Sequence, residues 1–187
     1  MTRGTVARSF HYVFIPDDPE LAIAKRGHEP ELGKRLRAGG RVDDWSRISY
    51  HVDKGVLSDY LANNDAFRLC SKPLREVIDR HRGNKDVIQW LPALVTQAQP
   101  PGHEYWILHF PEASDLVDVS RSVYSAGRLV KPILHPELVK GHQVFTVAHS
   151  SVSLIVADEL KRAIQDARCS GVKFSRVPDG NETESLR

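Results

Sequence analysis

Short runs of apolar and aromatic residues with strand-like alternation recur along the chain and predict several β-strands. The stretch richest in aromatic and β-branched residues is "HEYWILHF", residues 103–110. Another apolar run spans residues 87–95 but contains Pro92, which has no N–H to donate to a neighbouring strand. We therefore expect this run to be an edge strand, or to be split at the proline. Further strands are predicted at residues 9–15, 142–149 and 153–156.

A helical pattern follows a short apolar run that ends at residue 70. Leu74, Val77 and Ile78 recur at the spacing that places side chains on one face of a helix. Ser71 stands just before them, where its hydroxyl can accept a hydrogen bond from a free backbone N–H of the first turn. These features predict a helix near residues 71–82.

The same pattern returns near the carboxyl end, in "VADELKRAIQDARCSGVKF". Asp158 and Glu159 would lie in the first turn of a helix, where the helix dipole favours negative charge. Gly171 offers the left-handed backbone needed to leave the helix before a returning strand. We expect a helix near residues 158–169 with a narrow apolar stripe made by Leu160, Ala163, Ile164 and Ala167.

The remaining parts of the chain are less regular. Apolar residues within 54–63 recur at helical spacing and predict a helix there. Residues 115–127 are interpreted as a turn into a short helix, with Asp115 and Asp118 as capping residues. Residues 25–41 mix glycine, proline and charge, and are expected to form a short helix and loops.

These elements together predict a mixed α/β (α+β) domain, in which a sheet of several short strands packs against helices near 71–82 and 158–169. Residues 66–177 are expected to form this domain. Residues 1–65 form either a separate lobe or part of the same domain, and residues 178–187 form a flexible tail because they lack an apolar anchor.

Composition and charge are those of an ordinary globular protein. Hydrophobic residues make up 41% and charged residues 27% of the 187 residues, and the net charge of +2 does not by itself imply a nucleic-acid or membrane partner. The two cysteines, Cys70 and Cys169, belong to no paired motif and fit a reducing compartment. No stretch reaches the roughly 20 apolar residues that span a bilayer. We expect a cytoplasmic protein with no membrane partner.

Catalytic and metal-binding motifs are not found in the sequence. His135, His142 and His149 are seven residues apart, but the residues between them favour strands and turns over a shared helix face. The chain has no HExxH motif, no GxSxG elbow and no phosphate-binding glycine loop. We therefore expect no enzyme activity and no cofactor. The alternative is a small metal enzyme that uses histidines from separate loops.

A basic run from Lys25 to Arg47 contains seven Lys or Arg residues. It has three interpretations: a solvated segment, a docking surface for a protein partner, or a module that binds nucleic acid through cations and stacking aromatics. Arg and Trp are common anchors at protein interfaces. The residues selected as candidate partner anchors are Arg35, Arg37, Arg41 and Trp45.

Three stretches resemble one known family, the immunity proteins of bacterial polymorphic toxin systems represented by a Myxococcus xanthus protein. They are "CSKPLREVIDRH", "YWILHFPEASDLVDVSRSVY" and "VFTVAHSSVSLIVADELKRAIQDARCSGVKFSRV". Together they cover roughly residues 66–177, and the first 65 residues contain no such motif.

The resemblance implies stoichiometric binding and neutralisation of a cognate toxin, without catalysis or a cofactor. An inhibitor that mimics nucleic acid in a basic nuclease cleft should be strongly acidic, and this chain is not. We therefore expect either a toxin that is not a cationic nuclease, or inhibition away from the substrate cleft of the toxin.

Overall fold

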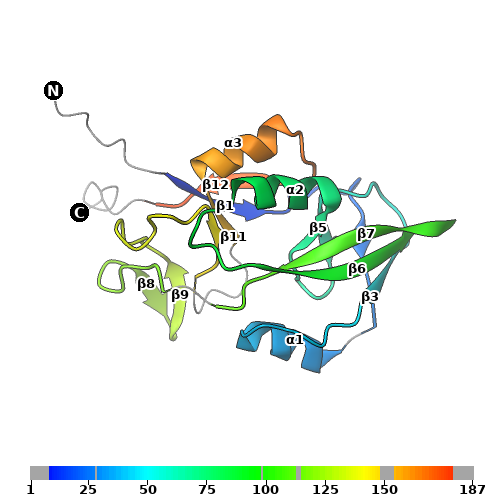
Figure 1. Ribbon diagram of the computed structural model, residues 1–187, viewed down its shortest axis with the longest axis horizontal. Coiled ribbons are helices and arrows are strands. Elements are labelled where there is room, and N and C mark those ends of the chain that lie inside the picture. The colour runs from blue at the N-terminus through cyan, green and yellow to red at the C-terminus, as the bar shows by residue number, and fades with distance from the viewer. Residues whose placement is uncertain (1–8, 28, 98, 113–114, 148–153, 179–187) are drawn as a thin grey trace.

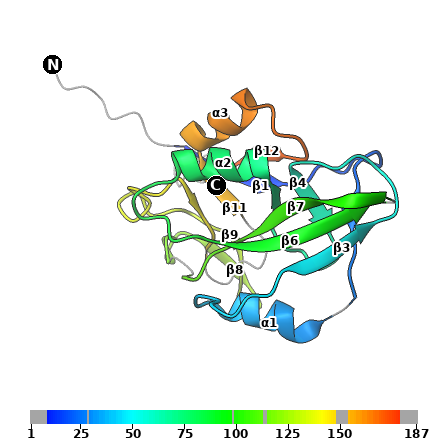
Figure 2. The same ribbon diagram turned by 45° about the vertical axis from the view of Figure 1, so that its right-hand side comes forward.

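Six strands form a sheet that nearly closes on itself like a barrel (Figures 1 and 2). The computed structural model describes residues 9–27, 29–97, 99–112, 115–147 and 154–178. The order of the strands is β2 (Ile23–Ala24), β4 (Tyr60–Asn63), β5 (Leu69–Ser71), β7 (Gln99–His109), β6 (Gln89–Gln97) and β3 (Ile48–Val52). The two outer strands approach each other where Lys25 and His51 exchange backbone hydrogen bonds of 2.7 Å in both directions.

The interior of this sheet is filled by the inward-facing side chains of its strands, since neighbouring residues of a strand point to opposite faces. Tyr50 and Val52 of β3 and Leu91 and Val95 of β6 are all nearly inaccessible to solvent. Helix α1 (Pro30–Ala38) lies on the side of the molecule opposite to the other two helices (Figure 1).

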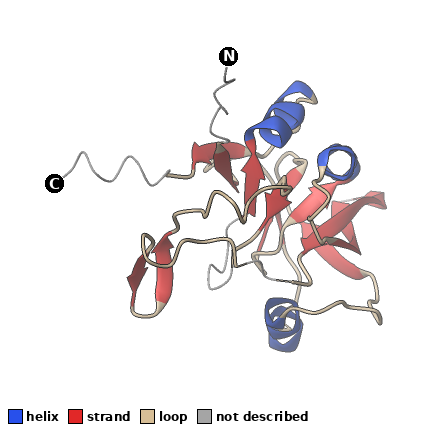
Figure 3. Cartoon of the chain, turned by 60° about the vertical axis from the view of Figure 1, so that its left-hand side comes forward, coloured by secondary structure: helices blue, strands red, loops and turns tan. Residues whose placement is uncertain are grey.

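A second, four-stranded sheet has the order β10 (Val144–Phe145), β11 (Leu154–Ala157), β1 (Phe10–Phe14) and β12 (Lys173–Arg176). Helices α2 (Lys72–His81) and α3 (Asp158–Asp166) lie together at one side of the molecule (Figure 3). One continuous core joins both helices, the outside of the six-stranded sheet and one face of the four-stranded sheet. The helices therefore bind the two sheets into one packed unit.

A long arm between β7 and β10 covers the opposite face of the four-stranded sheet. It contains a hairpin of β8 (Val123–Ser125) and β9 (Arg128–Lys131), which pairs with neither large sheet (Figure 1). Leu116, Val117 and Leu129 of the arm are buried in a third cluster with Phe145 and Ile155.

The two predicted helices near 71–82 and 158–169 are present, and their starts follow the expected chemistry. The Ser71 hydroxyl accepts a hydrogen bond of 3.4 Å from the Leu74 N–H, which confirms the predicted cap of α2. Helix α3 has no side-chain cap, but Asp158 and Glu159 lie in its first turn as predicted. The fold class is also confirmed in its broad sense, although the molecule is mostly β.

The end of α3 differs from the prediction. The helix ends at Asp166, and the left-handed residue that follows it is Arg168, with φ of 54°. Gly171 also has a φ of 73°, but glycine is needed there mainly because its backbone packs closely against β4 and the residues just before it. A Cβ atom there would lie 2.5 Å from both the Ser58 hydroxyl and the Tyr60 carbonyl oxygen.

The predicted helix at 54–63 is wrong, because this segment ends in strand β4. Tyr60 is buried in the core beneath the helices, whereas Leu61 is buried inside the barrel-like sheet. Burial of adjacent residues on opposite faces is the mark of a strand covered on both sides. Tyr60 and Leu61 therefore belong to a strand, and Val56, which completed the helical spacing, is 63% exposed.

The predicted edge or split strand at 87–95 is also wrong, because β6 is continuous and lies between β7 and β3. Pro92 is opposite Trp106 of β7, and pairing with β3 begins one residue later, at Ala93. On the side facing β3, the Pro92 carbonyl accepts a hydrogen bond of 2.9 Å from the Trp45 indole. The proline therefore interrupts no ladder hydrogen bond.

The predicted helix at 115–127 is replaced by the β8–β9 hairpin. Ala126 and Gly127 have φ of 47° and 73°, as a two-residue hairpin turn with a type I′ backbone requires. Asp118 does not cap a helix. Its carboxylate accepts a hydrogen bond of 3.1 Å from the Ser120 N–H and stabilises a local turn.

Strands from the first 65 residues pair with strands from the rest of the chain, since β1 lies between β11 and β12, and β3 pairs with β6. The division of the chain at residue 65 stays a prediction, and most of the predicted tail lies outside the described residues. Within the described part of the chain, no helix is both long and apolar enough to cross a membrane.

Candidate functional site

The candidate anchor residues lie on α1 and on the loop that follows it. Arg35 is exposed on α1 and forms an ion pair with Asp44, which lowers the pKa of that carboxyl group through a side-chain hydrogen bond. Arg41 is exposed in the loop, with its Nε 3.7 Å from an Asp43 carboxylate oxygen. Arg37 belongs to α1, and its side chain lies outside the described part of the structure.

Cations of the basic run are neutralised one by one by nearby carboxylates. The ion pairs are Lys25–Asp53, Arg26–Asp65, Lys34–Glu31, Arg35–Asp44, Arg41–Asp43 and Arg47–Glu104. These pairs involve six of the seven cations between residues 25 and 47. The segment is therefore a surface of alternating charge, unlike the continuous positive face that binds phosphates.

Trp45 belongs to a group of partly exposed aromatic side chains around Pro92. Trp106 is the cross-strand partner of Pro92, and Trp90 lies two residues before it on the same face of β6. Arg75 of α2 stacks on this group, 4.7 Å from the Trp106 ring and 5.7 Å from the Trp90 ring. Trp45 packs against the interior of the barrel-like sheet, whereas Trp90 packs against the core beneath the helices. Sequence reasoning missed Trp90 and Trp106 because only the β6–β7 register brings them together.

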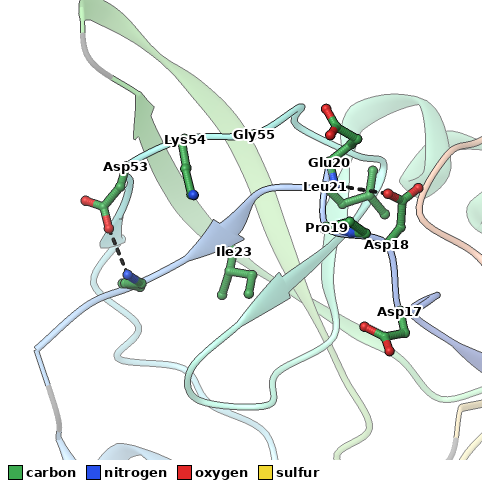
Figure 4. Close-up of a pocket in the computed structure, with 10 residues that line it drawn as sticks. Asp17, Asp18, Pro19, Glu20, Leu21, Ile23, Asp53, Lys54 and Gly55 are labelled. Atoms are coloured by element: carbon green, nitrogen blue, oxygen red, sulfur yellow. Dashed lines mark hydrogen bonds and ion pairs between the residues drawn. The ribbon is translucent and has the colours of Figure 1, made fainter.

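A surface hollow of about 420 Å³ lies where the barrel-like sheet closes (Figure 4). The closure is made by backbone hydrogen bonds between residue 56 and residues 20 and 22. Ile23, which is 53% exposed, lies between two groups of charged side chains. The lining includes four carboxylates and two lysines, namely Asp17, Asp18, Glu20, Asp53, Lys25 and Lys54.

Two carboxylates that line this hollow have hydrogen-bond partners within the molecule. Lys25 donates a hydrogen bond of 2.8 Å to Asp53 and lowers the pKa of that carboxyl group. Asp18 accepts a hydrogen bond of 3.0 Å from the Glu20 N–H, as in a local turn. The described lining contains no histidine, cysteine or serine.

The histidines are dispersed, and several have structural partners. His142 Nδ1 lies 3.0 Å from the buried Asp86 carboxylate, and His109 Nε2 lies 2.8 Å from the Gly40 carbonyl oxygen. Burial lowers the pKa of His109. His149 lies outside the described residues, and the described residues contain no group of three or more His, Cys, Asp or Glu side chains arranged to hold a metal ion.

The two thiols are buried within the same core cluster and are free. Burial raises the pKa of Cys70 strongly and raises that of Cys169 to about 11. A nucleophilic cysteine needs the opposite shift, because the thiolate is the reactive form. Both residues are therefore core side chains.

The sequence was also compared with known protein families and with curated proteins. Residues 3–179 match the model of the immunity protein family Imm11. This chain belongs to the Imm11 family. The match confirms the resemblance found in the three sequence stretches and extends it through the first 65 residues, where no motif was recognised. No curated protein gives a match. Membership of Imm11 gives the chain a function in immunity against toxins.

Proposed function

We propose that this Imm11 protein neutralises one cognate toxin by stoichiometric association and does so without catalysis. The observation that supports this most directly is the family match over residues 3–179. The described surface adds to it, since charged groups such as Arg35 and Arg41 are paired with nearby carboxylates. We further propose that the association takes place in the cytoplasm, where buried free thiols such as Cys70 are stable.

The pairing of the basic run favours a protein partner over nucleic acid. A phosphate backbone requires cations that are free to replace its counterions. Arg35 and Arg41 already have carboxylate partners, and binding phosphate would require these ion pairs to break. The alternative of a metal enzyme lacks a supporting site within the described residues, because these contain no group of three or more His, Cys, Asp or Glu side chains arranged to hold a metal ion.

The earlier anchor residues remain a proposal for contacts with the toxin. An interface of ordinary size buries about 800 Å² on each partner, and a few Trp, Tyr or Arg residues usually dominate its energy. Arg35, Arg37, Arg41 and Trp45 meet this description by residue type. We also retain the proposal that the toxin is not a cationic nuclease, or that it is inhibited away from its substrate cleft.

Co-expression tests the proposed function. The product of the gene next to the one that encodes this chain is the candidate toxin, and its toxin domain is expressed in a bacterial host alone and together with this protein. We expect growth arrest with the toxin domain alone, rescue by the immunity protein, and co-elution of the two proteins in gel filtration at equal molar amounts. Unrescued growth arrest, with the two proteins eluting separately, would contradict the proposal.

A further inference from the structure

Exposed apolar side chains are concentrated in the arm that contains the β8–β9 hairpin. Nine large hydrophobic residues of the described chain are exposed, and five of them lie between residues 119 and 138. They are Val119, Val123, Tyr124, Val130 and Leu138, with exposed fractions of 62%, 49%, 40%, 62% and 45%. Single exposed apolar residues are ordinary, but a group of this kind marks an interaction surface on a folded protein.

The arm is built to hold this group outward. Its base is fixed by a hydrogen bond of 2.7 Å from the Asp118 N–H to the Ile133 carbonyl and by one of 2.9 Å from the Ile133 N–H to the Ser122 hydroxyl. Leu129 is buried against the four-stranded sheet. Tyr124 is opposite Leu129 and shares its face of the hairpin, whereas Val123 is opposite Lys131 on the other face.

A β-bulge sets the direction of Val130. Val123 is opposite Lys131 and Tyr124 is opposite Leu129, so Val130 is an extra residue without a cross-strand partner. Bulges of this type redirect a side chain and end regular pairing. Here the bulge leaves a valine exposed at the centre of a strand, where a polar residue would be expected for solubility.

The charge of the hairpin differs from that of the basic run. Between residues 119 and 131 the sequence contains three cations and no acidic residue. Lys131 forms no ion pair within 4 Å with the described residues, and Arg121 interacts electrostatically with the nearby Asp118 without forming such a pair. The described cations of α1 and its loop are paired. A local excess of positive charge beside exposed apolar side chains fits a partner whose apolar patch is bordered by carboxylates.

We propose that the exposed side of the β8–β9 hairpin is the surface that docks the toxin, and that it binds an apolar patch of the toxin with an acidic border. This inference rests on the proposed function. It places the centre of the interface on the hairpin, with Val123 and Val130 as apolar anchors and Arg121 and Lys131 as steering charges.

The experiment measures the dissociation constant between the toxin domain encoded by the neighbouring gene and full-length variants of this protein. Val130→Asp is paired with the control Val56→Asp, because Val56 is 63% exposed and lies beside the hollow at the sheet closure. Lys131→Glu is paired with Lys54→Glu, which changes an exposed lysine of the hollow. Arg35→Ala combined with Arg41→Ala tests the α1 segment. Thermal melting of each variant verifies that the fold is retained.

We expect Val130→Asp to weaken binding by about 30-fold or more, as for a central interface residue. Lys131→Glu should slow association several-fold, and high salt should remove this effect. The controls should bind like the wild type. Wild-type affinity in both hairpin variants, with loss in Val56→Asp or in the α1 variant, would overturn the inference and leave the proposed function intact.

Two other outcomes separate the hypotheses further. A wild-type protein that does not bind the toxin domain would overturn the proposed function and this inference with it. A wild-type dimer that Val130→Asp converts to a monomer would show that the hairpin binds a second copy of the chain, and would also overturn the inference.

Discussion

Removal of the buried Asp86 carboxylate tests how the loop after α2 is joined to strand β10. The Asp86 side chain has 0% exposure and accepts hydrogen bonds from four donors. The donors are the N–H groups of Gly83, Gln143 and Val144, with distances of 2.6, 3.0 and 3.0 Å, and the His142 ring nitrogen at 3.0 Å. One carboxylate thus satisfies three backbone donors from two distant segments.

The loss in free energy of unfolding follows from the number of donors that Asp86→Ala leaves without an acceptor. A buried donor without a partner costs about 1–3 kcal/mol, so three backbone donors set a range of about 3–9 kcal/mol. Water that enters the vacated space reduces this cost. We therefore expect Asp86→Ala to lower the free energy of unfolding by about 3–4 kcal/mol, a large part of the roughly 5–15 kcal/mol typical of a domain.

Asp86→Asn provides a milder test that keeps the fold. Its amide oxygen can still accept two hydrogen bonds, but its NH₂ group faces donors, so we expect a loss of about 2 kcal/mol. For a chain of this length that loss lowers Tm by about 4–8 °C. Asp43→Ala is the matched control, because this carboxylate is 84% exposed and should contribute less than about 0.5 kcal/mol.

The assay is equilibrium urea unfolding followed by tryptophan fluorescence and far-ultraviolet circular dichroism. The linear dependence of the free energy on urea concentration gives the stability of each variant. Equal stability of Asp86→Asn and Asp43→Ala would refute the argument, because it would show that the hydrogen bonds from the four donors contribute nothing beyond an exposed ion pair.

Three further predictions concern a glycine, the thiols and a histidine. Gly171 and Gly127 share a φ of 73°, but a Cβ atom meets close contacts only at Gly171. Gly127→Ala should cost about 1–2 kcal/mol of backbone strain, and Gly171→Ala about 1–3 kcal/mol more; equal urea midpoints would contradict this. Native Cys70 and Cys169 should react slowly with a thiol reagent at neutral pH and rapidly in urea, because burial raises both pKa values; fast native labelling would show that they are accessible. Burial lowers the native pKa of His109 below the unfolded value of about 6.5, so the unfolded chain binds more protons below that pH. Stability should therefore fall as the pH decreases from about 7 toward the native pKa, and His109→Gln should reduce this fall; a wild-type protein that becomes more stable over that interval would contradict the sign.

Local signals in the sequence were sufficient to predict helix α2. Its cap at Ser71 and its apolar face at Leu74, Val77 and Ile78 depend on residues within one helix. Prediction of strand β4 would have required information from distant parts of the chain, since Tyr60 and Leu61 are buried in two different cores. A pattern of apolar residues cannot distinguish one wide helical face from two buried strand faces.

The hairpin was missed for a related reason. Its turn uses Ala126 at φ of 47°, a position usually occupied by Asn, Asp or Gly, so the expected turn signal was lacking. Pro92 was misread because its neighbour on the β3 side is a tryptophan indole from residue 45 and not a strand.

Only some features of the candidate surfaces could be predicted from the sequence. The carboxylates that pair with Arg35 and Arg41 lie nine and two residues away, so neutralisation of this segment could have been foreseen. The excess of cations in residues 119–131 is also visible in the sequence. The exposure of Val130 was not, because it depends on the bulge in the hairpin register.

Titration of the toxin domain with this protein tests the central claim of stoichiometric neutralisation most directly. The residual activity of the toxin is measured on its own substrate after increasing amounts of immunity protein are added. Stoichiometric binding predicts a linear decrease that reaches zero at one immunity protein per toxin, with full activity recovered when the complex is dissociated. Progressive and permanent inactivation by a small fraction of an equivalent would show that the protein acts as a catalyst on the toxin.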